Sequence, residues 1–200
     1  MANKKLLKLV THDGSFHSDD IFAAAALSIY LENKGETFEI VRTRDEEIIK
    51  KADYVFDVDG IYDEKNNQFD HHQAGGAGKR ENGIAYSSFG LVWRKFGIEI
   101  AGERTTSDFI EQKLVVPVDA NDNGIDLSRS NFPDISEYTV QDVFAIFSPT
   151  ALENLDKDEQ FAKALVWAKE VLKREIKRAN DQGKIRKIIR QSRKLPGAVR

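Results

Sequence analysis

The sequence has no cysteine, one methionine and four prolines among its 200 residues. Without cysteine the chain can form neither a disulfide framework nor a thiolate metal site. No apolar run is long enough to span a membrane, and the apolar stretch at the N-terminus is too short for a signal peptide, so we predict a first strand there. These absences lead us to expect a cytoplasmic protein that does not contact a membrane.

Charge is distributed unevenly along the chain. The formal net charge is -3, and 40% hydrophobic with 32% charged residues is ordinary for a globular protein. Basic residues far outnumber acidic ones from Lys173 to Arg200, so the rest of the chain is acidic. An acidic region can gather carboxylates around metal, and a basic tail can bind nucleic acid or phosphate. A solvated charged helix is the alternative interpretation of the tail.

The first third of the sequence predicts alternating strands and helices. The predicted strands are 5–11, 38–43 and 54–58, and the predicted helices are 18–31 and 45–52. This alternation favours an α/β fold with a doubly wound, mainly parallel sheet and helices on both faces. Sites in such sheets lie at the carboxyl ends of strands, where His12, Asp57 and Asp59 fall.

The remainder predicts a helical extension. The predicted helices are 87–96, 107–115, 140–147 and 158–178. Residues 117–124 are predicted to form a tight, carboxylate-rich turn. The glycine-rich stretch 74–83 does not match a P-loop and is either a lid or an ordinary flexible loop. We therefore predict an α/β metal-binding catalytic domain over 1–135 and a helical extension with a basic tail over 136–200.

All four histidines lie before residue 73, in two short clusters. The pair His12 and His17 follows the first predicted strand, and the pair His71 and His72 follows a strand-like run. Packing does not explain why histidine is used nowhere else, whereas metal ligation does. His12, His17 and His71, together with Asp19, are therefore the metal ligands that the pattern indicates.

Carboxylates near these histidines complete the predicted site. Asp57 ends the third predicted strand and can reach the same crevice, and Asp119 arrives from a later turn. Imidazole and carboxylate without thiolate suit Mn²⁺, with Mg²⁺, Zn²⁺ or Co²⁺ as competitors. More than four ligands are too many for one closed zinc site, but they fit two ions that share a bridging carboxylate.

Several acidic residues have alternative interpretations. Asp20 either caps the first helix or adds a charge to the site. Asp59 either takes part in the site or forms a turn with Gly60, and Asp70 is either a surface charge or a residue that orients a histidine. Asp122 is either a turn residue or a ligand.

Four motifs occur in order: Thr11–Asp20, Asp57–Gly60, Phe69–Gln73 and Val118–Gly124. Together they resemble the melanocyte proliferating gene protein family, often labelled a metal-dependent protein hydrolase. The stretch Tyr138–Phe144 is also similar to this family. The family is related to the DHH phosphoesterase superfamily, named for the Asp-His-His that stands here at residues 70–72.

The resemblance implies a DHH phosphoesterase-like domain with a dinuclear site, usually of manganese. By motif, the implied metal ligands are His12, His17, Asp19, Asp57, His71 and Asp119. Asp57 would bridge the ions and His72 would face the substrate phosphate, so His72 and Asp20 are the catalytic candidates. Asp59, Asp70 and Asp122 are candidates for a supporting role around the ligands.

The resemblance also implies a metal-dependent hydrolase, a phosphoesterase or 3′–5′ exonuclease-like enzyme acting on nucleotides or single-stranded nucleic acid. Asp59 stands where the family pattern usually has glycine, and relatives carry a further C-terminal domain that helps to hold substrate. A metal-binding interaction module with little catalysis is therefore the alternative. A peptide hydrolase, as the family label suggests, would need a motif such as His-Glu-x-x-His that the sequence lacks. A homo-oligomer is left open.

Overall fold

The computed structural model describes residues 4–192 and the side chains as far as residue 186. Its strands form one sheet in the order β2-β1-β3-β5-β4. Their bounds are β1 Leu6–Thr11, β2 Thr37–Arg42, β3 Tyr54–Phe56, β4 Tyr62–Asp63 and β5 Gln68–Phe69. All neighbouring pairs are parallel except β4 with β5. The predicted mainly parallel sheet is confirmed.

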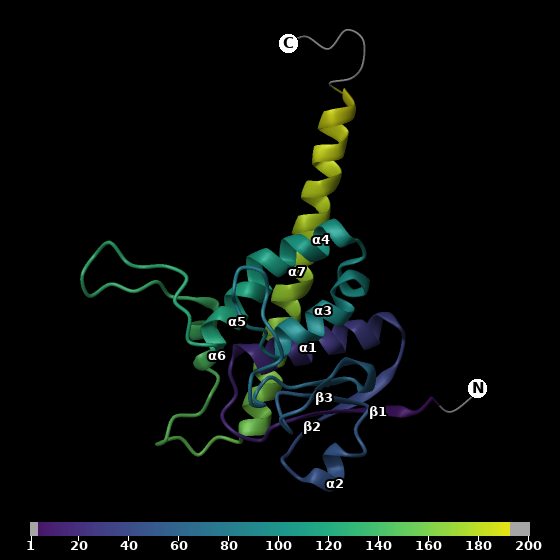
Figure 1. Cartoon of the computed structure of the whole chain (residues 1–200), viewed down its shortest axis with the longest axis vertical. Helices are drawn as coiled ribbons and strands as arrows, with labels where there is room; N and C mark the ends of the chain where they lie inside the picture. Colours follow the sequence, from purple (N-terminus) through teal and green to yellow (C-terminus); the bar gives the residue numbers. More distant parts are fainter. Residues whose placement is uncertain (1–3, 193–200) are drawn as a thin grey trace.

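Helices cover both faces of this sheet (Figure 1). The α-helices are α1 Ser18–Asn33, α2 Glu46–Ile49, α3 Ser88–Ala101, α4 Arg104–Ile110, α5 Val116–Asp122, α6 Val140–Ala145 and α7 Lys157–Ser192, with a 3₁₀ turn at Glu64–Asn66 and a π-helical turn at Glu111–Val115. α1 and α3 pack on one face, while short α2 packs Ile49 against Val10 and Val55 on the other. This arrangement is the predicted doubly wound fold.

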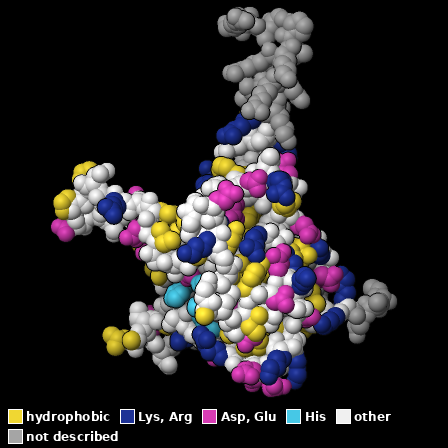
Figure 2. All heavy atoms as spheres, in the orientation of Figure 1, with side chains coloured by type: hydrophobic (Ala, Val, Ile, Leu, Met, Phe, Trp, Pro, Cys, Tyr) yellow, Lys and Arg dark blue, Asp and Glu magenta, His cyan; other side chains and the backbone are white. Residues whose placement is uncertain are grey.

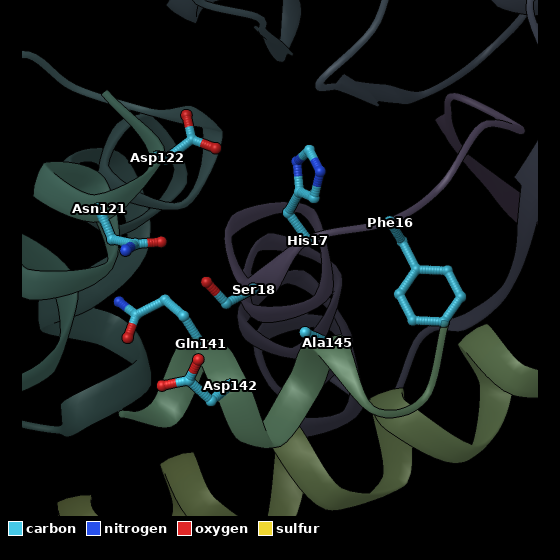
Figure 3. A pocket seen from close by; sticks show the side chains of 8 residues that line it. All are labelled: Phe16, His17, Ser18, Asn121, Asp122, Gln141, Asp142 and Ala145. Carbon is cyan, nitrogen blue, oxygen red and sulfur yellow. The ribbon is translucent and has the colours of Figure 1, made fainter. Parts of the chain in front are cut away.

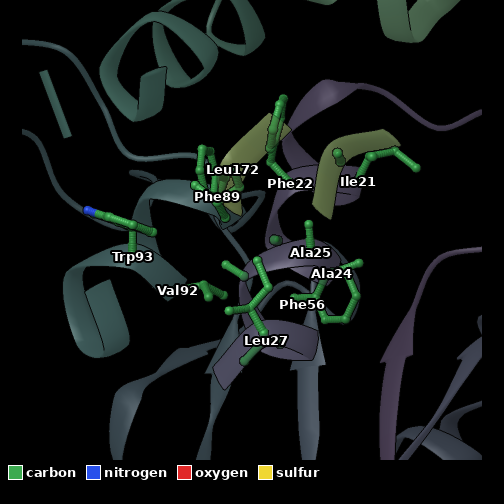
Figure 4. Packing of buried hydrophobic residues seen from close by; sticks show 14 of the residues in the cluster. Ile21, Phe22, Ala24, Ala25, Leu27, Phe56, Phe89, Val92, Trp93 and Leu172 are labelled. Atoms are coloured by element: carbon green, nitrogen blue, oxygen red, sulfur yellow. The ribbon is translucent and has the colours of Figure 1, made fainter. Parts of the chain in front are cut away.

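The main core lies between the sheet, α1, α3 and α7. α1 is buried almost along its whole length, and its alanines 23–26 are fully buried. Their small side chains let neighbouring elements approach closely. Phe22 of α1 stacks on Phe89 of α3 at 5.2 Å between ring centroids and meets Phe144 of α6 edge-on at 5.0 Å. Figure 4 shows Phe22 beside Phe89 in this core, a contact that fixes the start of α1 relative to α3.

The C-terminal helices contribute to the same core. α7 buries Phe161, Ala164, Ala168 and Leu172 at helical spacing against it. The extension therefore shares a hydrophobic cluster with the sheet, and the division of the chain at residue 135 stays a prediction. The last part of the basic tail, residues 193–200, lies outside the described residues. None of the described helices has the length and apolar character needed to cross a membrane.

The turn predicted at residues 117–124 was wrong, because α5 occupies most of it. Pro117 lies at the N-terminal end of α5, which continues directly from the π-helical turn Glu111–Val115, so proline falls where the helix changes its hydrogen-bond pattern. Gly124, with φ 69°, follows the end of the helix. Asp119 and Asp122 consequently lie about one turn apart on a single helix.

Candidate metal centre

The candidate site lies where β1 and β3, adjacent and parallel, end. His12 follows β1 and Asp57 follows β3, so the sheet brings the two residues together. Nε2 of His12 lies 3.2 Å from Oδ2 of Asp57 and 3.1 Å from Oδ2 of Asp20. Burial alone would lower the pKa of His12, but these two carboxylates outweigh it and raise the pKa to about 9.

Asp57 connects the two histidine clusters. Its Oδ1 lies 3.3 Å from Nε2 of His71 and accepts a hydrogen bond from Oγ of Ser88 at 3.1 Å. Burial would raise its pKa, but His12 and His71 outweigh burial and hold the pKa well below its usual range. Asp57 has φ 55°, the left-handed region that non-glycine residues rarely adopt. The backbone therefore departs from ordinary geometry to aim this carboxylate.

Asp70 organises the second histidine cluster. Its Oδ1 accepts hydrogen bonds from the backbone N–H groups of His71 and His72, and it lies 2.7 Å from Nδ1 of His72. Its Oδ2 accepts the backbone N–H of Gly60. Asp70 is thus a buried residue that orients the histidine loop, whereas the side chain of His72 remains 62% exposed.

A third group joins the start of α1 to the end of α5. It consists of His17, Asp19 and Asp122. Oδ2 of Asp122 lies 3.3 Å from Nε2 of His71, and Oδ2 of Asp19 lies 3.9 Å from the same nitrogen. Burial, followed by the charges of Asp57 and Asp122, raises the pKa of Asp19 well above its usual value. His17, Asp19 and Asp122 are therefore continuous with the cluster around His71 and His72.

Asp20 fulfils both roles that the sequence left open. Its Oδ1 accepts the backbone N–H of His17 and so caps α1. Its Oδ2 faces His12 and makes no hydrogen bond among the described residues. One side chain therefore fixes the start of α1 and offers an oxygen to the site.

Asp119 lies apart from these groups. Its Oδ1 accepts hydrogen bonds from Oγ of Ser87 at 2.5 Å and from the backbone N–H of Gly90 at 3.1 Å. Its Oδ2 lies 2.7 Å from Nη2 of Arg80, which also binds Glu111. Burial raises the pKa of Asp119 to about 7, although Arg80 and Ser87 oppose the rise. The structure thus brings Asp122, and not Asp119, to the histidines.

Buried polar atoms that lack a hydrogen bond among the described residues indicate what the site can hold. Both carboxylate oxygens of Asp19, Oδ2 of Asp20 and Nε2 of His71 are buried and make no hydrogen bond among the described residues. Such groups are costly to bury unless something pairs with them. The grouped side chains are His12, His17, Asp19, Asp20, Asp57, Asp70, His71, His72 and Asp122. This imidazole and carboxylate donor set fits divalent metal ions, so the clusters can bind them.

A cavity of about 540 Å³ opens beside these groups. Its lining includes His12, His17, Asp57 and His72, and Arg44 is the one lysine or arginine among the described residues that line it. The exposed Asp59 also lines this cavity and lies outside the three groups. In Figure 2 histidine atoms reach the surface between two protruding segments, so ligands can approach from solvent.

Sequence reasoning gave no role to Ser88 or Arg44. Ser88 begins α3 and Arg44 follows β2, far from the histidine motifs in the sequence. A serine at a helix start normally indicates only a cap. The one available signal was the position of Arg44 after a parallel strand, at the edge where such sheets bind ligands.

Comparison with known proteins identifies the family of this chain. Residues 8–195 match the family model MYG1_exonuc, described as an uncharacterised protein family (UPF0160). The MYG1 protein of Chlamydia pneumoniae is 34% identical over 188 residues, which cover 91% of this chain and 58% of that protein. MYG1 protein C27H6.8 of Caenorhabditis elegans is 31% identical over 191 residues, covering 84% of this chain and 54% of that protein.

The MYG1 exonuclease of Homo sapiens is 34% identical over 137 residues, covering 59% of this chain and 36% of that protein. The chain thus spans about half the length, or less, of the curated relatives it matches. No solved structure matches it. The family model nevertheless covers nearly the whole chain, and the predicted family is confirmed: the chain belongs to the MYG1_exonuc family.

Proposed function

We propose that this chain is a metal-dependent hydrolase that cleaves phosphodiester bonds in nucleotides or single-stranded nucleic acid with two metal ions, preferably Mn²⁺. The observation that carries the proposal is the position of Asp57 between His12 and His71, beside buried carboxylate oxygens that make no hydrogen bond among the described residues. The names of the human and bovine relatives, MYG1 exonuclease, support a nucleic acid substrate.

The donor set divides into two halves that share Asp57. His12 and Asp20 would hold one ion with it, and His71 would hold the other together with the group of His17, Asp19 and Asp122. Two bound ions would supply a hydroxide nucleophile and Lewis-acid stabilisation of a phosphoryl oxygen. We assign to Asp122 the α5 ligand position that the sequence motif assigned to Asp119, because Asp122 faces His71.

Protein side chains would bind and orient the phosphate in the adjoining cavity. Asp70 accepts a hydrogen bond from Nδ1 of His72, so Nε2 of this exposed ring can exchange a proton with substrate. Arg44, which also lines this cavity, supplies a positive charge for a phosphate oxygen. The chain thus offers a proton carrier and an anion contact beside the candidate metal ligands.

Replacement of Asp57 with asparagine tests the proposal. Asparagine has almost the same size and tolerates the left-handed backbone, so Asp57→Asn should fold while losing the shared negative charge. We expect it to abolish Mn²⁺-dependent release of nucleotides from short RNA, measured with end-labelled oligonucleotides. Asp108→Asn, an exposed aspartate of α4, is the matched control. Wild-type turnover in Asp57→Asn would overturn the assignment.

A further inference from the structure

A second cavity, of about 380 Å³, borders the candidate metal centre from the side of α5 and α6. It shares His17 and Asp122 with the metal-binding groups. In Figure 3, Asn121 and Gln141 lie on one side of it and His17 on the other, with Ser18 between them. Gln141 belongs to the stretch Tyr138–Phe144, to which the phosphoesterase chemistry gives no role. The cavity therefore joins an unexplained motif to the reaction site.

The polar lining of this cavity includes several hydrogen-bond acceptors. Nε2 of Gln141 donates one of its two hydrogens to the backbone carbonyl of Pro117 at 3.1 Å, which fixes the plane of the amide and keeps Oε1 as an acceptor for a ligand. The carboxylates of Asp122 and Asp142 can only accept when ionised, and Oδ2 of Asp142 already accepts the backbone N–H and the hydroxyl of Thr139. Asn121 is exposed and offers both a donor and an acceptor. A ligand that brings N–H donors is favoured here.

The cavity has room for a ring. Its apolar wall includes Phe16 and Ala145, and its volume lies in the range of small-molecule sites. A neighbouring cavity of about 310 Å³ also has Asn121 and Gln141 in its lining, so the hollow continues away from the metal groups.

We infer that this cavity binds the base of the nucleotide at the cleaved bond, and that Gln141 selects bases with an exocyclic amino group over uracil. The inference rests on the proposed function, because the base enters only if the adjoining groups bind its phosphate. Cytosine and uracil are the sharpest pair, since an amino donor on one ring replaces a carbonyl acceptor on the other. The amino group would donate to Oε1 of Gln141, whereas the carbonyl would face an acceptor.

Binding of nucleoside monophosphates tests the inference without catalysis. In the presence of Mn²⁺, the full chain should bind cytidine monophosphate about tenfold more tightly than uridine monophosphate in a calorimetric titration. Gln141→Met should bring the ratio close to one. Gln112→Met, an exposed glutamine remote from the cavity, is the matched control and should keep the ratio. Equal affinities in the wild-type chain would overturn the inference, as would an unchanged ratio in Gln141→Met.

A modified ligand covers the case in which Gln141→Met does not fold. N4,N4-dimethylcytidine monophosphate has no amino hydrogen, so it should bind the wild-type chain as weakly as uridine monophosphate does. Binding as tight as that of cytidine monophosphate would overturn the inference. Hydrolysis of bis(p-nitrophenyl) phosphate, which has no base, reports on the proposed function separately. Its absence with Mn²⁺ would refute the hydrolase, while the nucleotide ratio would still decide the role of the cavity.

Discussion

The buried carboxylate of Asp119 and a neighbouring cluster of four carboxylates are neutralised differently in this molecule. Asp119 is paired with Arg80, a cation that the chain itself provides. Asp19, Asp20, Asp57 and Asp122 form ion pairs with histidines, and no lysine or arginine among the described residues pairs with them. Buried charge persists when it is paired or binds metal. The first group therefore has the composition of a structural ion pair, and the second leaves a place for cations from solution.

The elements that each group joins agree with this contrast. Asp119 ties α5 to Ser87 and Gly90 at the start of α3, and Arg80 adds the glycine-rich stretch. A Cβ atom on Gly90 would lie 1.9 Å from Oδ2 of Asp119, so the contact depends on glycine. The second group instead opens towards two cavities. One cluster fastens elements together, while the other is accessible to ligands.

Removal of the internal cation should have the largest effect on stability. Arg80→Met leaves Asp119 buried without its partner and should lower the free energy of unfolding by about 3–5 kcal/mol at pH 8. Burial already raises the pKa of Asp119, and without Arg80 the pKa should rise further, so the carboxyl is neutral and the loss smaller at pH 5. Urea unfolding at the two pH values measures this difference.

The double variant Arg80→Met with Asp119→Asn is the control for this prediction. It removes both charges and should recover part of the lost stability, because no unpaired carboxylate remains. Arg104→Met, at an exposed arginine of α4, should leave stability nearly unchanged. A loss in Arg80→Met no larger than that in Arg104→Met would show that Asp119 needs no internal cation.

Addition of an external cation should have the next largest effect. Mn²⁺ at about 100 times its dissociation constant should stabilise the wild-type chain by about 2.7 kcal/mol, because it binds the folded carboxylates and not the unfolded chain. Urea unfolding with Mn²⁺ and with a chelator gives the difference. Asp57→Asn should gain clearly less. Equal stability in Mn²⁺ and chelator would contradict the contrast between the two groups.

The smallest of these effects separates the two aspartates of α5. Asp122→Asn should weaken Mn²⁺ binding at least about tenfold, since Asp122 faces His71. Burial raises the pKa of Asp122, and the nearby charge of Asp57, which a metal ion would neutralise, raises it further. Asp119→Asn should retain the affinity, because Arg80 and Ser87 occupy that carboxylate. The reverse result, measured by metal titration, would return the ligand role to Asp119.

Sequence patterns predicted the parts of the site that depend on the order of strands along the chain. His12 and Asp57 follow strands that had to be parallel, so their meeting at one sheet edge could be anticipated. The choice between Asp119 and Asp122 could not, because residues three apart on a helix share a face and only tertiary packing decides what each one meets. Arg80 illustrates the same limit. Its pairing across 39 residues follows from the fold and leaves no periodic signal.

The left-handed backbone of Asp57 carries an evolutionary consequence. Glycine adopts that conformation without steric cost, whereas aspartate gives up folding free energy to hold it. A lineage selected only for heat resistance would thus tend towards glycine at this position and lose the carboxylate between the two histidine clusters. Under the proposed function, aspartate here would mark chains under selection for chemistry, and its replacement by glycine in a relative would mark a protein that kept the scaffold without the reaction.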